Sequence, residues 1–171
     1  RTGYQHLYWY NLNGQLLRTV TKGDFEVSAF YGYDAATQSF YYASHEDGPL
    51  QTTICRADRS GRVTRLSAEK GQNSAVFSKS LKYFMNVWSN LDTPPVTTLR
   101  DGNGKRLATL IDNASLKQKV DAFSGQRELF SFVTPDGVQL NGWMVKPRDF
   151  DASKRYPVIM YQYSGPGSQE V

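Results

Sequence analysis

The sequence predicts a mainly β chain whose first two thirds form part of a β-propeller, and three observations lead to this prediction. First, Tyr, Phe and Trp make up 13% of the 171 residues, and aromatic residues favour strands. Second, the turn residues Gly, Asn, Asp and Ser recur at short intervals along the chain. Third, one pattern of strand, turn and strand occurs three times at the spacing of a propeller blade.

The repeated pattern is a pair of strands joined by a turn that contains glycine. The three turn glycines, Gly14, Gly61 and Gly104, are 47 and 43 residues apart. Further strand pairs lie between the copies, at residues 27–31 with 40–43 and residues 74–77 with 83–88. Four strands in about 45 residues form one blade. Residues 1–112 are therefore predicted to hold about two and a half C-terminal blades, and since these cannot close a ring, we expect the other blades to precede Arg1.

A short helix is predicted in residues 113–124, which we interpret as the linker after the propeller. Leu116, Val120 and Phe123 are spaced so that they share one helical face, and Asp112 with Asn113 forms a capping pair before them.

Residues 125–171 change to longer strands. Residues 127–134 and 138–146 are predicted as a hairpin around the turn Pro135-Asp-Gly137. A polar loop then leads to an apolar run, and we expect residues 158–163 to form a third, buried strand before the turn Gly165-Pro-Gly167. The order of hairpin, loop, third strand and turn is that in which an α/β-hydrolase domain begins.

Tyr163 stands at the end of this expected third strand. A phenol at the carboxyl end of a sheet strand, followed by glycines that let the backbone turn, can aim its O–H at a developing oxyanion. The alternative is a structural tyrosine beside an ordinary turn, and residue types alone leave both interpretations open.

Several segments resemble one family of serine peptidases. Tyr163-Ser-Gly-Pro-Gly-Ser-Gln169 is similar to a segment of dipeptidyl peptidase IV, in the prolyl oligopeptidase family, and Phe150-Asp-Ala-Ser-Lys-Arg-Tyr-Pro157 resembles the entry to the same strand. Thr21-Lys-Gly-Asp-Phe-Glu-Val27 and Asp112-Asn-Ala-Ser-Leu116 resemble its propeller and the join to its hydrolase domain. These segments follow the family's order over nearly the whole chain.

The resemblance implies a parent enzyme that releases N-terminal dipeptides after a penultimate Pro or Ala by serine acyl transfer, without metal or cofactor. It implies a peptide substrate, a homodimer, and a periplasmic or cell-surface location. Of the family's functional residues only the oxyanion-hole tyrosine can be carried over, onto Tyr163. The sequence has no Gly-x-Ser-x-Gly pentad, and the resemblance places the catalytic Ser, Asp and His beyond Val171. The acidic pair that holds the substrate amino terminus would lie before Arg1, so we expect this piece alone to be inactive.

Other site types are weakly represented. The basic cluster Arg56, Arg59, Arg62 and Arg65 is interrupted by acidic and turn residues, which indicates a solvated hairpin end and no nucleic-acid partner. No apolar run approaches the ~18 residues of a membrane span, so no membrane contact is expected from this segment. Cys55 lies in a strand-like run and is expected to be a buried side chain and no nucleophile.

The sequence leaves three alternative functions to consider. Gly165-x-Gly167 could begin a dinucleotide fingerprint, but Pro166 removes an N–H and Glu170 replaces the third glycine. The propeller could be a non-catalytic module that binds a peptide or protein. The parent could also be a related prolyl tripeptidyl or acylaminoacyl peptidase, although the segment after Tyr163 favours the dipeptidyl branch.

Overall fold

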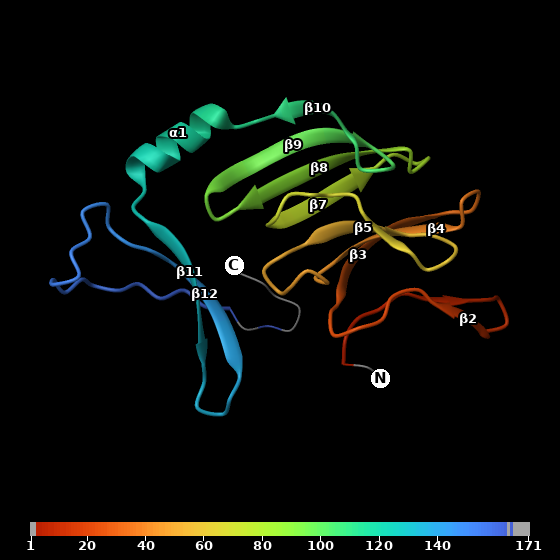
Figure 1. Ribbon diagram of the computed structural model, residues 1–171, viewed down its shortest axis with the longest axis horizontal. Coiled ribbons are helices and arrows are strands. Elements are labelled where there is room, and N and C mark those ends of the chain that lie inside the picture. The colour runs from red at the N-terminus through yellow and green to blue at the C-terminus, as the bar shows by residue number, and fades with distance from the viewer. Residues whose placement is uncertain (1–2, 164, 166–171) are drawn as a thin grey trace. The chain divides into compact units, whose positions relative to one another are not determined.

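The computed structural model describes residues 3–163 and 165. The chain divides into two compact units, one of residues 1–90 and 95–112 and one of residues 91–94 and 113–171. The first unit consists mainly of strands, and the second contains a helix, a hairpin and an extended stretch (Figure 1); the sheets are antiparallel.

The first unit contains two and a half blades, as the sequence predicts. The half blade is a hairpin of β1 (Tyr8–Tyr10) and β2 (Leu16–Thr19). The first complete blade pairs four strands in chain order: β3 (Val27–Asp34), β4 (Ser39–Ser44), β5 (Thr53–Ala57) and β6 (Val63–Arg65). The second does the same with β7 (Gln72–Phe77), β8 (Tyr83–Asn90), β9 (Thr93–Asp101) and β10 (Arg106–Ile111).

The turns of β1–β2, β5–β6 and β9–β10 are built alike. In each, a side-chain oxygen accepts hydrogen bonds from the backbone N–H groups two and four residues later, at 2.9–3.1 Å. A glycine three residues on has a positive φ of 76–92°, a conformation that other residues adopt at a cost. The accepting residues are Asn11, Asp58 and Asp101, and the glycines are Gly14, Gly61 and Gly104. The repeat found in the sequence is therefore a repeat of turn geometry.

The hydrophobic core lies on both faces of the β4–β5 pair. Tyr42 and Cys55 belong to one cluster, which packs against Leu7 and Trp9 beside the half blade. Tyr41 and Ile54 point into the other cluster, which packs against the second complete blade through residues such as Phe84. Successive strand residues face opposite sides, so every residue of β4 is buried.

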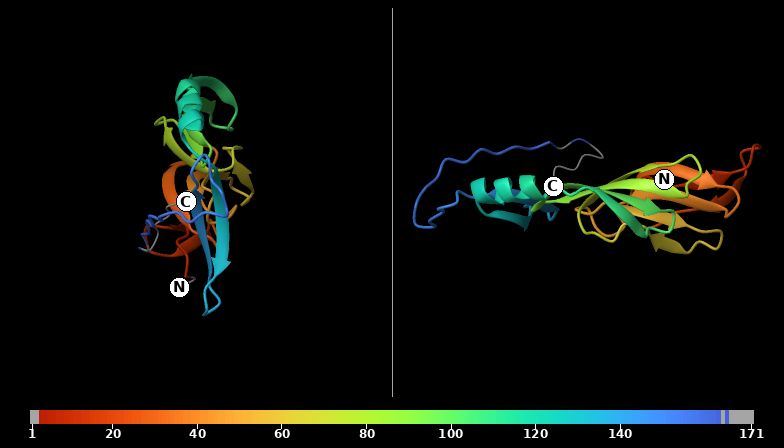
Figure 2. Two further views of the ribbon diagram at one scale, coloured as in Figure 1. Left: turned by 90° about the vertical axis from the view of Figure 1, so that its left-hand side faces the viewer. Right: turned by 90° about the horizontal axis from the view of Figure 1, so that it is seen from above.

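The second unit contains the linker helix and a hairpin. Helix α1 (Ala114–Phe123) follows Asn113, as predicted, but Asn113 makes no side-chain capping hydrogen bond, and Leu116 and Phe123 on the apolar face of the helix are exposed. Strands β11 (Arg127–Val133) and β12 (Gln139–Val145) pair without a register shift, and Figure 2 shows them side by side along their length.

Arg127 connects three parts of this second unit. Its Nη2 donates to Asp121 Oδ1 of α1 at 2.8 Å, and its Nε lies 3.5 Å from Asp92 Oδ1 in the β8–β9 turn. Because Arg127 opens β11, these contacts fasten the start of the hairpin to the helix and to that turn.

The structure does not form the third strand that the sequence predicts at residues 158–163. These residues carry no strand pairing, and the side chains of Val158, Ile159 and Met160 are 87%, 98% and 86% exposed. A strand requires a neighbour that satisfies its backbone hydrogen bonds, and no described residue supplies one. The apolar run is present, but its pairing partners are not among residues 3–163 and 165.

Within the described residues, the structure contains no helix of the length and apolar character required to cross a membrane.

Candidate oxyanion donor and the polar blade junction

Tyr163 lies on the extended, solvent-exposed stretch after the hairpin, with 63% of its surface accessible. Its ring packs over Gly165: a Cβ atom on that glycine would stand 2.8 Å from Tyr163 Cε1 and 3.1 Å from its Oη. Any other residue at position 165 would displace the ring, so Gly165 permits the placement of the phenol. The rest of the segment that resembles the peptidase family, Ser164 and residues 166–171, lies outside the described residues.

The chemistry available at Tyr163 is donation of one O–H hydrogen bond. Such a donor stabilises an oxyanion but cannot start an acyl-transfer reaction without a nucleophile.

Among the described residues, no group of three or more His, Cys, Asp or Glu side chains is arranged to hold a metal ion.

Cys55 is a buried side chain, as the sequence predicts. It is 0% exposed, and burial raises the pKa of its thiol to about 12. A thiol with this pKa contributes almost no thiolate at neutral pH, which makes it inert as a nucleophile.

The two histidines hold backbone segments together. His6 lies 3.1 Å from both Thr21 Oγ1 and the Gly23 carbonyl oxygen, and His45 Nδ1 lies 2.8 Å from the Gln51 carbonyl oxygen. These contacts join loops of the propeller unit and give both side chains a structural role.

Contacts within the propeller unit engage three arginines of the basic cluster, Arg56, Arg62 and Arg65. Arg62 pairs with Asp58 at 3.2 Å inside its own turn. Arg56 donates to Asn103 Oδ1 at 2.8 Å, in the equivalent turn of the next blade. These contacts support the prediction of a hairpin end.

A buried polar junction between the two complete blades was missed by the sequence reasoning. Arg100, only 4% exposed, forms an ion pair with Glu69 and donates to the Gly104 carbonyl oxygen at 3.1 Å. Asn86 Nδ2 donates to Asn73 Oδ1 at 3.0 Å, and Asn73 Nδ2 donates to the Glu69 carbonyl oxygen at 3.0 Å. The one available signal was a polar Asn86 inside the otherwise apolar run of residues 83–88.

The serial four-stranded antiparallel sheets and their repeated turns define this chain as part of a β-propeller protein. A sequence model of the dipeptidyl peptidase IV N-terminal region matches residues 1–95. The chain belongs to the dipeptidyl peptidase IV family, which confirms the resemblance found in its segments.

Named relatives agree with this assignment. A probable dipeptidyl peptidase 4 of Aspergillus flavus is 29% identical over an alignment of 174 positions that covers 99% of this chain and 23% of that protein. Dipeptidyl peptidase 4 of Bos taurus is 29% identical over an alignment of 178 positions that covers 98% of this chain and 23% of that protein.

Solved structures give the same result. The crystal structure of Porphyromonas gingivalis dipeptidyl peptidase 4 matches with a TM-score of 0.91 and 38% identity, over 98% of this chain and 24% of that one. A putative dipeptidyl aminopeptidase IV from Bacteroides ovatus matches with a TM-score of 0.75 and 25% identity, over 96% and 24% of the two chains. This chain therefore spans about a quarter of the length of the proteins it matches.

Proposed function

We propose that this chain is part of a serine exopeptidase that releases dipeptides from the free amino terminus of peptides, after a penultimate Pro or Ala. The observation that carries the proposal is the likeness over 98% of the chain, at 38% identity, to a protein named dipeptidyl peptidase 4. In such an enzyme residues 1–112 would be propeller blades, residues 113–124 the linker, and residues 125–171 the start of the α/β-hydrolase domain.

Tyr163 is the residue of this chain that we assign to the chemistry. Its exposed phenol is available to donate to the oxyanion of a tetrahedral intermediate, and the lack of a Cβ at Gly165 leaves room for the ring. The Ser, Asp and His of the reaction would come from outside this chain. The donor acts most strongly when charge has developed on the carbonyl oxygen, so it should affect the catalytic rate constant more than the Michaelis constant.

The substrate class is tested with the full-length protein that contains this chain. We expect release of the chromophore from a Gly-Pro amide and from a Gly-Ala amide, and none from the acetylated Gly-Pro amide, whose amino terminus is blocked. A serine-directed inhibitor should abolish the activity. Cleavage of only acetylated or tripeptidyl substrates would assign the protein to another peptidase branch, and no cleavage at all would leave a binding module.

The role of Tyr163 is tested by Tyr163→Phe in the same full-length protein. Removal of one oxyanion donor typically costs about 10²–10³ in the catalytic rate constant, and the ring and its contact with Gly165 are retained. Rate and melting temperature are measured on one preparation. A stable variant that turns over at the parent rate would exclude the oxyanion role, and a loss of melting temperature without a loss of rate would indicate a structural tyrosine.

A further inference from the structure

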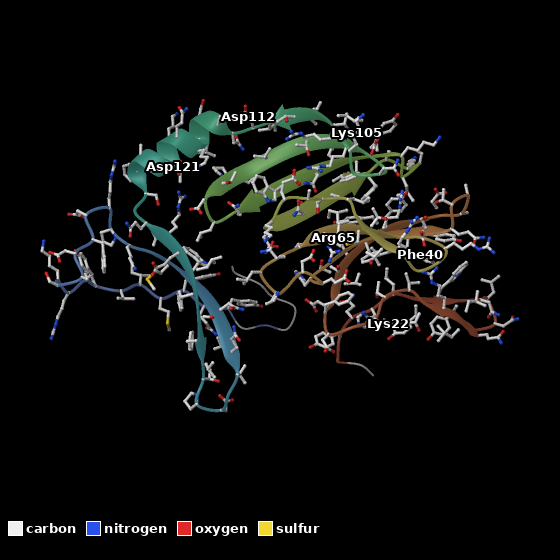
Figure 3. All side chains as sticks on the ribbon, in the orientation of Figure 1. Lys22, Phe40, Arg65, Lys105, Asp112 and Asp121 are labelled. Atoms are coloured by element: carbon white, nitrogen blue, oxygen red, sulfur yellow. The ribbon has the colours of Figure 1, made fainter. Side chains whose placement is uncertain are left out.

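The propeller unit contains a polar pocket of about 540 Å³ that is separate in sequence from the Tyr163 segment. It is lined by the loop between β4 and β5, by β6, and by the segment that leads to β7. Figure 3 labels Arg65, the lining residue contributed by β6.

Both carboxylates that line this pocket are already neutralised. Asp47 accepts hydrogen bonds from Arg65 Nε at 2.9 Å and from Thr53 Oγ1 at 2.8 Å. Glu69 is paired with the buried Arg100. These carboxylates therefore have partners within the protein and do not demand a cation from solution.

Several hydrogen-bond donors that line the pocket, in contrast, have no acceptor among the described residues. Lys70 is exposed at the pocket wall, and among the described residues no acceptor is bonded to its Nζ. Arg65 pairs with Asp47 through its Nε and Nη2, which leaves Nη1 for another partner. Gln51 is held by its Oε1, which accepts from the Gly71 N–H at 2.7 Å, so its Nε2 donors remain.

We propose that this pocket binds the carboxylate of a small organic acid or of a peptide C-terminus. Among the lining residues Asp47 is paired with Arg65, and Glu69 is paired with Arg100 from outside the lining, so the ammonium of Lys70 is the lining charge without a bonded partner. A guanidinium and an ammonium form the strongest hydrogen bonds with ionised oxygens. A carboxylate carries one negative charge, which matches the one ammonium, whereas a phosphate dianion would bring a second charge that the lining does not balance.

The test uses the full-length protein that contains this chain and saturation-transfer NMR, which detects weak ligands directly. The probes are N-acetylglycine, glycolate, and N-acetylglycinamide, which has the body of the first probe without its charge. We expect saturation transfer to N-acetylglycine and about a tenfold loss of affinity in Lys70→Gln, the effect of one charge-assisted hydrogen bond. Lys70→Arg should retain binding. Lys105→Gln, which removes an exposed lysine from the β9–β10 turn (Figure 3), is the matched control and should change nothing.

The outcomes separate the two sources of the carboxylate. Binding of glycolate as well as N-acetylglycine identifies a free organic acid, and binding of N-acetylglycine alone identifies a peptide C-terminus. Equal binding of N-acetylglycinamide, equal affinity in Lys70→Gln and Lys105→Gln, or tighter binding of inorganic phosphate would overturn the proposal, as would the absence of any saturation transfer.

Discussion

Replacement of two equivalent turn glycines by alanine compares the free-energy cost of an added Cβ atom in an open turn with its cost in a turn that contacts the preceding blade. Gly14 and Gly104 occupy the same place in the repeated turn, with φ values of 76° and 88°. A Cβ atom on Gly14 would meet nothing within 4 Å. A Cβ atom on Gly104 would lie 2.6 Å from the carbonyl oxygen and 2.8 Å from the Cα of Leu66, in the segment that follows the first complete blade.

The two substitutions share one cost and differ in another. An alanine in left-handed backbone costs about 1–2 kcal/mol, and the stiffer unfolded chain returns about 0.4–1 kcal/mol. Gly14→Ala should therefore lower the free energy of unfolding by about 1 kcal/mol. Gly104→Ala adds overlap with backbone that cannot rotate away, for which overpacking costs of about 1–3 kcal/mol are typical. Its total should be about 2–4 kcal/mol.

Urea unfolding of both variants in the full-length protein that contains this chain, followed by tryptophan fluorescence and by circular dichroism, gives the two free energies when the two signals coincide. The difference between the variants isolates the contact of Gly104 with Leu66, because the turn geometry is common to both. If Gly104→Ala destabilised the protein no more than Gly14→Ala, the close approach of the second blade to Leu66 would be refuted.

Three further results are expected. The hydrogen bond from Arg65 holds the pKa of Asp47 below its ordinary value. A carboxyl whose pKa is lowered by folding stabilises the fold above its unfolded pKa, and this stabilisation is lost as the pH falls through the folded pKa. Asp47→Asn should therefore flatten the drop in melting temperature below about pH 4, and an unchanged dependence of melting temperature on pH in this range would contradict this. The 171-residue chain alone should not hydrolyse a Gly-Pro chromogenic amide, and inhibitor-sensitive turnover above a mock preparation would show that a nucleophile has been overlooked. The same chain should self-associate through its uncovered sheet faces, whereas sedimentation as a dilute monodisperse monomer with cooperative unfolding would count against an incomplete propeller.

The sequence predicts the propeller strands well because each blade repeats a local signal. Glycine turns such as those at Gly14 and Gly104 recur at the spacing of the blades, and strands rich in aromatic residues lie between them. The linker helix was also predictable, since three apolar residues share one face of it. These signals act over a few residues and need no knowledge of the tertiary structure.

The third strand and the polar junction depend on long-range contacts, and local patterns do not encode these. Residues 158–163 have the composition of a buried strand, yet strand formation requires a paired neighbour. Arg100 and Glu69 are 31 residues apart in sequence, and nothing near either residue indicates the other. The assignment of Tyr163 came from the resemblance of its segment, because residue types alone favoured a structural role.

The burial of β4 and β8 shows how packing on both faces of a blade buries its residues. In β8 the pattern alternates: Phe84 and Asn86 are buried, whereas Tyr83 and Met85 are exposed. In β4 all six residues are buried, because one face packs beside the half blade and the other against the second complete blade. The exposed residues Tyr83 and Met85 of β8 are large and mainly apolar, so they too are suited to a covering layer. The stability of each blade therefore depends on both of its neighbours, and this is why we place the greatest sensitivity to substitution at the junctions between blades rather than inside a single sheet.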